Sequence, residues 1–157
     1  DAALGAGRSH TAHPHADPAS RRLVGWTWAQ RPVDGTIQLT FTEYDAAPGM
    51  PPRESTTYVM PDCTLAPHDF ALTARYYVVF QNRLALDLPS FVLGLKGPAA
   101  SLSLQNQEPM VAHLIPRPGA FPPGAAPAPR VIPVGRGFTI HFSHAHDAGA
   151  DRVVCYT

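Results

Sequence analysis

The sequence predicts an all-β chain of about ten short strands with no convincing helix. Proline and glycine are frequent, with 18 and 12 residues among 157, which favours short elements separated by turns. Apolar and polar residues alternate over residues 37–42, the period-2 pattern of a half-buried strand. Apolar residues make up 45% of the chain, which is enough for a packed core.

Regularly spaced short strands with turn signals are typical of a β-sandwich or a β-propeller. A propeller blade has four strands, so about ten strands would fill about two and a half blades. Because a closed propeller needs at least about four blades, the pattern predicts either a sandwich or one part of a propeller.

The expected strands can be placed in chain order. They are residues 23–28, 37–42, 56–60, 70–73, 76–81, 84–88, 102–104, 110–115, 131–134, 138–142 and 152–156. Residues 1–20 lack periodicity and predict a loop, and residues 90–95 predict a single helical turn. The Ala/Pro/Gly-rich residues 118–129 have almost nothing to bury, so a flexible surface loop is expected there within a single domain spanning residues 1–157.

Composition excludes several classes of partner. The 12 basic and 12 acidic residues balance, so no charged surface points to nucleic acid. No apolar run approaches the roughly 20 residues of a membrane span. Cys63 and Cys155 have no CxxC spacing, which makes reduced thiols and an intracellular setting the expectation.

Histidine is abundant, with eight residues, and three histidines sit in comparable settings beside strand-like segments. They are His13, His68 and His141, which we interpret as ligands of one metal ion delivered by different parts of a β architecture. Two His-x-His pairs, His13/His15 and His144/His146, could also chelate a metal, because residues i and i+2 share one face of a strand.

Three segments carry a family resemblance. They are Thr-Ala-His-Pro-His-Ala-Asp-Pro at residues 11–18, Pro-His-Asp-Phe-Ala-Leu-Thr at 67–73, and Gly-Phe-Thr-Ile-His-Phe-Ser-His-Ala-His-Asp at 137–147. In this order they resemble the ligand segments of the carotenoid cleavage oxygenases, the apocarotenoid-cleaving, retinal-pigment-epithelium-protein-like non-haem iron dioxygenases. The resemblance covers most of the chain. This chain departs from the family at His144 and Asp147, where the family has Asn and Glu.

The resemblance implies an all-β fold that is part of a seven-bladed β-propeller, with about two to three blades present in this chain. It implies an Fe(II) ion held by four histidines, three of them His13, His68 and His141, with the fourth outside this chain. Glu43, Glu54 and Glu108 match none of the family's ligand-orienting glutamates.

The implied activity is O2-dependent cleavage of a polyene double bond of carotenoids or apocarotenoids to carbonyl products. The partners would be an apolar polyene and O2, with peripheral membrane contact for substrate uptake in the full-length protein. The location would be intracellular, cytoplasmic or plastid. This chain by itself would be a fragment that binds iron weakly and is inactive.

Two other readings stay open at this point. One is a small β-sandwich metalloprotein that uses the His-x-His pairs, and the other is a non-catalytic propeller relic. Four aromatic residues could line an apolar tunnel but are more often plain core: Trp26, Trp28, Phe70 and Phe142.

Overall fold

The computed structural model describes residues 10–105 and 107–157, and 44% of the chain is strand against 5% helix. The strands are β1 (His15–Asp17), β2 (Arg22–Gln30), β3 (Ile37–Asp45), β4 (Pro52–Val59), β5 (Ala71–Leu72), β6 (Tyr76–Gln81), β7 (Leu84–Leu86), β8 (Leu102–Leu104), β9 (Met110–Pro116), β10 (Arg130–Gly135), β11 (His144–Asp147) and β12 (Val153–Tyr156). The helices are α1 (Leu88–Val92) and the short 3-10 turn η2 (Ala99–Ser101).

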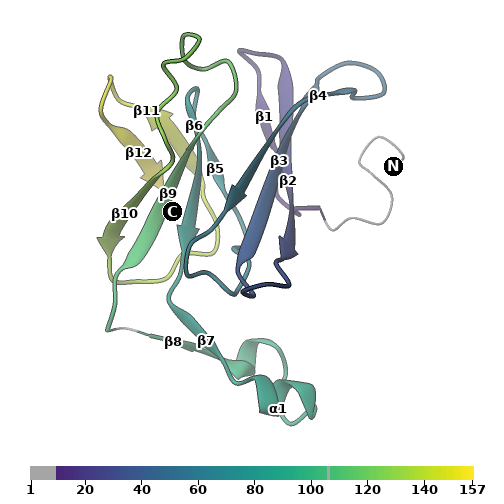
Figure 1. Ribbon diagram of the computed structural model, residues 1–157, viewed down its shortest axis with the longest axis vertical. Coiled ribbons are helices and arrows are strands. Elements are labelled where there is room, and N and C mark those ends of the chain that lie inside the picture. The colour runs from purple at the N-terminus through teal and green to yellow at the C-terminus, as the bar shows by residue number, and fades with distance from the viewer. Residues whose placement is uncertain (1–9, 106) are drawn as a thin grey trace.

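The strands form two complete four-stranded antiparallel sheets and two smaller ones. Sheet A has the order β1-β2-β3-β4 and sheet B the order β10-β9-β6-β5. Strands β11 and β12 form a third sheet beside sheet B, and β7 and β8 form a small hairpin-like extension that carries α1 away from the sheets (Figure 1). In both large sheets the chain runs from an inner strand, β1 or β5, to the strand at the opposite edge, β4 or β10 (Figure 1), and the two inner strands lie in contact with each other.

One hydrophobic core lies between sheets A and B. Alternate residues of β3 point into it, as the period of the strand requires. The ring of Phe41 stacks on Tyr77 of β6, with centroids 4.3 Å apart, and meets Phe70 edge-on at 5.4 Å. Fully burying each such side chain contributes on the order of 1.5–3 kcal/mol, so this core joins the two sheets firmly.

A second core lies between sheet B and the β11–β12 pair. Ala71, Tyr76, Val78 and Ala145 are buried in it. Sheet B is therefore covered on both faces, which explains why residues 76–80 are continuously apolar and do not alternate. Phe121 packs on Tyr76 at 5.6 Å, so the 118–129 segment, although it lacks regular structure, partly buries this side chain.

The sequence located most strands correctly, but it was wrong about residues 138–142. That segment is extended without strand pairing, and β11 follows it at residues 144–147. The reason is topological, because the segment crosses from the outer strand β10 to β11 and has no neighbouring strand. It is tied instead to Asn82, whose side chain accepts from the Thr139 N–H at 3.0 Å and donates to the Thr139 carbonyl at 2.7 Å.

The helical content agrees with the predicted single turn. Helix α1 begins after Asp87, whose carboxylate accepts a hydrogen bond from the Ser90 N–H, with a proline in its first turn. Among the described residues, no helix has the length and apolar character needed to cross a membrane. Cys63 and Cys155 are not joined in a disulfide, and burial raises the pKa of each thiol to about 11.

Candidate metal centre

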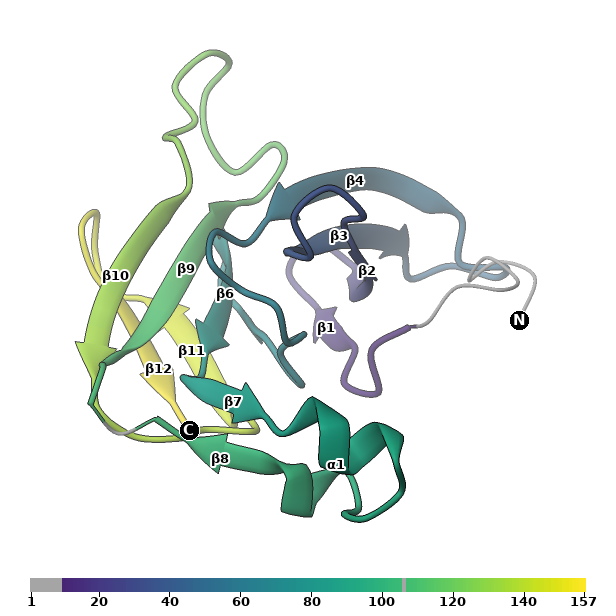
Figure 2. The ribbon, with the colours of Figure 1, turned by 60° about the horizontal axis from the view of Figure 1, so that its bottom comes forward.

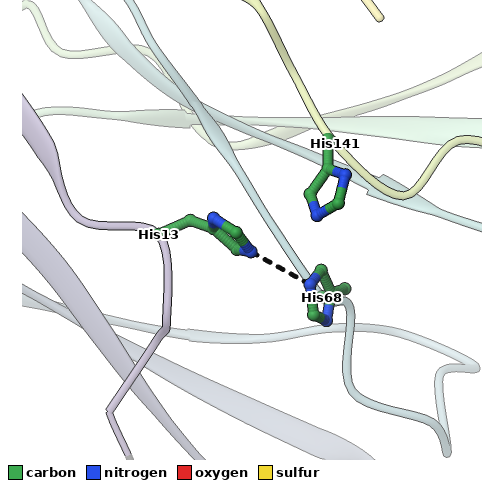
Figure 3. A group of neighbouring side chains, drawn as sticks. All are labelled: His13, His68 and His141. Carbon is green, nitrogen blue, oxygen red and sulfur yellow. Dashed lines mark hydrogen bonds between the residues drawn. The ribbon is translucent and has the colours of Figure 1, made fainter.

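The site is organised by three inner strands. Strands β1, β5 and β11 are each the first strand of their sheet in chain order and lie at one edge of it, and β5 is in contact with both of the others. A histidine stands two or three residues before each strand: His13 before β1, His68 before β5 and His141 before β11. Because the three strands start at the same side of the molecule, the three side chains meet there (Figure 3).

Local contacts hold the backbone that carries His13. Thr11 donates its N–H to the Trp26 carbonyl at 2.9 Å, which fastens the segment to β2. The His13 N–H then donates to the Thr11 hydroxyl at 3.0 Å, a short-range turn of the kind that threonine favours. His13 itself lies outside the strands, as the predicted loop requires, but the loop prediction was wrong about His15–Asp17, which form β1 by pairing with β2.

The three imidazole rings converge on one point. The Nε2 atoms of His13 and His68 are 3.0 Å apart, and the ring centroids of the three pairs are separated by 4.9, 4.8 and 5.1 Å. One ring nitrogen from each histidine lies within 4.8 Å of the others. His68 and His141 are exposed and His13 is half-buried, so the point is open to a ligand.

The donor set fits a first-row divalent metal. A metal about 2.1 Å from two imidazole nitrogens at a right angle places those nitrogens about 3.0 Å apart, which matches His13 and His68. Neutral imidazole suits iron, zinc and copper, and a set of three nitrogens leaves further coordination positions open. Within residues 10–105 and 107–157, this is the single group of three or more His, Cys, Asp or Glu side chains that converges in this way.

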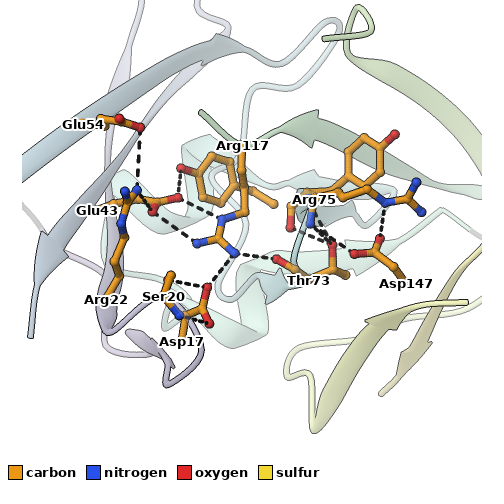
Figure 4. A network of polar contacts seen from close by, with 11 residues as sticks. Asp17, Ser20, Arg22, Glu43, Glu54, Thr73, Arg75, Arg117 and Asp147 are labelled. Atoms are coloured by element: carbon orange, nitrogen blue, oxygen red, sulfur yellow. Dashed lines mark hydrogen bonds and ion pairs between the residues drawn. The ribbon is translucent and has the colours of Figure 1, made fainter. Parts of the chain in front are cut away.

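The glutamates lie elsewhere, as their sequence positions suggested. Glu54 pairs with Arg22 at 3.7 Å and Glu108 with Arg83 at 3.4 Å. Glu43 is fully buried in a polar network with Arg22, Arg117 and Asp17 (Figure 4). Asp17 is the last residue of β1, so the network lies at the end of that strand away from His13. In the part of the chain that the structure describes, the histidine cluster has no glutamate partner.

The network around Arg117 joins sheet A to sheet B. The Arg117 guanidinium donates to Glu43 at 2.9 and 3.2 Å, to the Thr73 carbonyl at 2.7 Å and pairs with Asp17 at 2.9 Å. Burial raises the pKa of Glu43, but hydrogen bonds from Arg117, Arg22 and Tyr77 outweigh it and hold that pKa below its usual value. One sequence signal could have revealed this network: Glu43 continues the apolar face set by residues 37, 39 and 41.

Of the four histidines in the two His-x-His pairs, His13 alone belongs to the three-histidine cluster. His13 faces His68 and His141, whereas the His15 ring packs edge-on against Phe70 at 4.6 Å. The rings of His144 and His146 stack on each other at 5.4 Å and lie beside Tyr156 of the neighbouring strand. The structure therefore does not favour the sandwich metalloprotein.

The aromatic side chains considered as tunnel linings separate into two groups. Trp26 and Phe70 belong to the core between sheets A and B, so they are core residues. Trp28 is 46% exposed, and Phe142 meets Phe80 edge-on at 4.9 Å in the second core. His113 is also structural: it is fully buried, with its two ring nitrogens bonded to the Tyr58 hydroxyl and the Gln81 side-chain carbonyl.

Fold and site together define the class of protein: a β-propeller whose inner strands present histidines to a common point. Comparisons with known proteins agree. The family described as retinal pigment epithelial membrane protein matches residues 2–157, and this chain belongs to that family. The predicted resemblance and the predicted all-β propeller architecture are thereby confirmed.

Individual relatives come from the same group. The apocarotenoid-15,15'-oxygenase of Synechocystis sp. is 26% identical over 98% of this chain. The crystal structure of cobalt-substituted Synechocystis ACO superposes with a TM-score of 0.78 at 26% identity over 95% of this chain, and that of an ACO/RPE65 chimera with 0.77, also at 26% identity over 95%. This chain spans 30% of the length of each of these three relatives.

Proposed function

We propose that this chain is part of an Fe(II)-dependent dioxygenase that cleaves a polyene double bond of carotenoids or apocarotenoids to carbonyl products. The observation that carries the proposal is the convergence of His13, His68 and His141 at the starts of three successive inner strands. Membership of the family supports the oxygenase class, and the name of the Synechocystis relative supports an apocarotenoid substrate. That a relative accepts cobalt supports a divalent metal at the equivalent place.

The chain's own residues would hold and orient the metal. The three imidazoles would bind it in their neutral form, through nitrogens that already face one another. The bound iron would supply O2 activation. A fourth ligand is expected from a part of the complete protein that this chain does not include, so the 157-residue chain alone should bind iron weakly and be inactive.

The proposal is tested with the complete gene product by replacing His68 with alanine. Removing one convergent ligand should lower Co(II) or Fe(II) affinity by more than the 10–100-fold typical of outer-shell changes and abolish conversion of an apocarotenal to its cleavage product. Metal content after gel filtration and product formation by chromatography are the measurements.

The matched control is His144→Ala, because His144 is also an exposed histidine near the site but faces Tyr156. It should keep metal and activity. If instead His144→Ala removed the metal and His68→Ala did not, a site built on the His-x-His pair would replace this one. A wild-type protein that binds no metal would point to the non-catalytic relic.

We further propose that the region around α1 contacts a membrane from which an apolar polyene is taken up, within an intracellular, cytoplasmic or plastid location. Leu88, Phe91, Val92, Leu93 and Leu95 are each between 41% and 74% exposed, although they are large apolar side chains. They gather on α1 and the turn after it, which project from the sheets (Figure 2). Exposed apolar patches of this kind typically mark interaction surfaces, and partial insertion into a lipid surface suits them.

Vesicle co-sedimentation of the complete gene product tests this proposal. The double variant Leu93→Ser and Leu95→Ser should lower the bound fraction on phosphatidylcholine vesicles several-fold, because both side chains are more than 70% exposed and would insert. The control is Val33→Ser, which changes a 79% exposed apolar residue in the turn between β2 and β3. Equal loss in both variants, or no loss in the double variant, would contradict membrane contact at α1.

A further inference from the structure

Asp69, the residue after His68, is a buried carboxylate with only 5% of its surface exposed. Its Oδ1 accepts a hydrogen bond from the Phe70 N–H at 2.7 Å. Its Oδ2 accepts a second bond from the Phe142 N–H at 2.9 Å, which no sequence pattern indicated. Both oxygens are thus engaged by backbone donors from two different segments, one leading into β5 and the other into β11.

These contacts reach all three segments that carry the clustered histidines. Phe70 lies two residues after His68, and Phe142 directly follows His141. The third segment approaches from β1, where the His15 Nε2 lies 3.6 Å from the Asp69 Oδ1. That nitrogen is buried and has no hydrogen-bond partner, so the carboxylate is the polar group it faces.

The segment around His141 has no strand pairing, and side chains from other elements bond its backbone on both sides of that residue: Asn82 at Thr139 and Asp69 at Phe142. Just beyond, the Phe142 ring packs on Phe80, and the Ser143 N–H donates to the Tyr156 carbonyl at 2.9 Å. His141 stands between the Asn82 anchor and the Asp69 anchor. Releasing the second anchor would let the backbone next to His141 move, and the imidazole would move with it.

We propose that Asp69 is the positioning residue of the metal centre: it sets the place of His141 relative to His68 by bridging the two segments through the Phe142 N–H. This inference rests on the proposed function, since it assumes that the three histidines bind a metal. Asp69 acts through the backbone and does not touch the reacting atoms. An outer group of this type typically changes metal affinity by about 10–100-fold.

The test is Asp69→Asn in the complete gene product. An amide has one acceptor oxygen where the carboxylate has two, so one of the two backbone donors loses its partner. We expect Co(II) affinity to fall by about 10–100-fold, a changed visible absorption spectrum of the bound Co(II), and faster hydrogen exchange at the Phe142 amide of the metal-free protein.

The control is Glu43→Gln, the same chemical change at a second buried carboxylate that also bridges two sheets but lies at the far ends of the inner strands. It should destabilise the protein while leaving Co(II) affinity and spectrum as in the wild type. If Asp69→Asn keeps affinity within twofold, or loses no more than Glu43→Gln does, the positioning role is wrong and the proposed function stands. If the wild type itself binds no Co(II), both are wrong.

Discussion

The two ends of the inner strands β1, β5 and β11 are held together by different chemistry. At their starts, three exposed or half-buried histidines converge and a single carboxylate, Asp69, bridges two of the segments. At their ends, arginines join the same strands: Arg117 pairs with Asp17, the last residue of β1, and donates to the Thr73 carbonyl after β5. Arg75 pairs with Asp147, the last residue of β11, at 3.3 Å.

This difference between the two ends suggests that the arginine end stabilises the fold, whereas the histidine end would bind a metal. Guanidinium groups satisfy several acceptors at once in a fixed geometry, so a buried arginine holds neighbouring sheets in one arrangement. Arg75 likewise donates to the carbonyls of Gly149 and Ala150 in the turn after β11. The histidine end has ring nitrogens that face one another, an arrangement that a bound cation would complete. We therefore expect substitutions at the two ends to affect different properties.

The largest effect is expected from Arg117→Ala. It removes one of the two arginines that bond Glu43 and the arginine that pairs with Asp17, and breaking a buried pair typically costs about 3–5 kcal/mol of unfolding free energy. Metal affinity should stay within a few-fold of wild type, because the histidines lie at the other end. Urea unfolding and Co(II) titration of the complete gene product measure the two properties.

Arg53→Ala is the matched control for Arg117. Arg53 pairs with Asp45 at the surface, with 53% of its side chain exposed, so the expected change in unfolding free energy is within about 0.5 kcal/mol. The separation of the two ends would be refuted if Arg117→Ala lowered metal affinity as strongly as removal of His68.

A smaller effect on the unfolding free energy, one that depends on pH, is expected from His113, an uncharged side chain that links the same two sheets by hydrogen bonds. It links the hydroxyl of Tyr58 in β4 with Gln81 in β6, and burial lowers the pKa of its imidazole to about 4. The pKa of His113 in the folded state lies below its unfolded value near 6.5. The contribution of neutral His113 to the unfolding free energy is therefore fully present above about pH 6.5 and is lost as the pH falls toward 4. The loss between pH 7 and pH 5 should be about 2 kcal/mol.

His113→Gln provides the comparison, because glutamine does not titrate. The difference in unfolding free energy between wild type and variant should shrink by about 2 kcal/mol from pH 7 to pH 5. A difference independent of pH would show that His113 is not kept neutral by burial. The carboxylates of Glu43 and Asp17, whose pKa values are lowered, should begin to lose their contribution only at more acidic pH.

Local patterns in the sequence were sufficient to predict most of the strands. The alternation over residues 37–42 lies within β3, because side-chain direction along a strand depends only on its period. The apolar run at residues 76–80 lies within β6. Residues 138–142 show why a local pattern is not sufficient. They have a strand-like pattern, but a strand also needs a neighbouring strand to pair with, and these residues have none because they lie between two sheets. Helix α1 was anticipated at nearly its observed position.

The sequence by itself was sufficient to single out the three histidines and to place each of them beside a strand, since the motifs that contain them are short and local. Only the tertiary structure decided that their ring nitrogens meet, that His15 and His144 turn elsewhere, and that Glu43 is buried under two arginines. The same holds for the hydrogen bond between Asp69 and Phe142. The physical reason is that these contacts join residues far apart in the chain, and packing of whole sheets sets their distances.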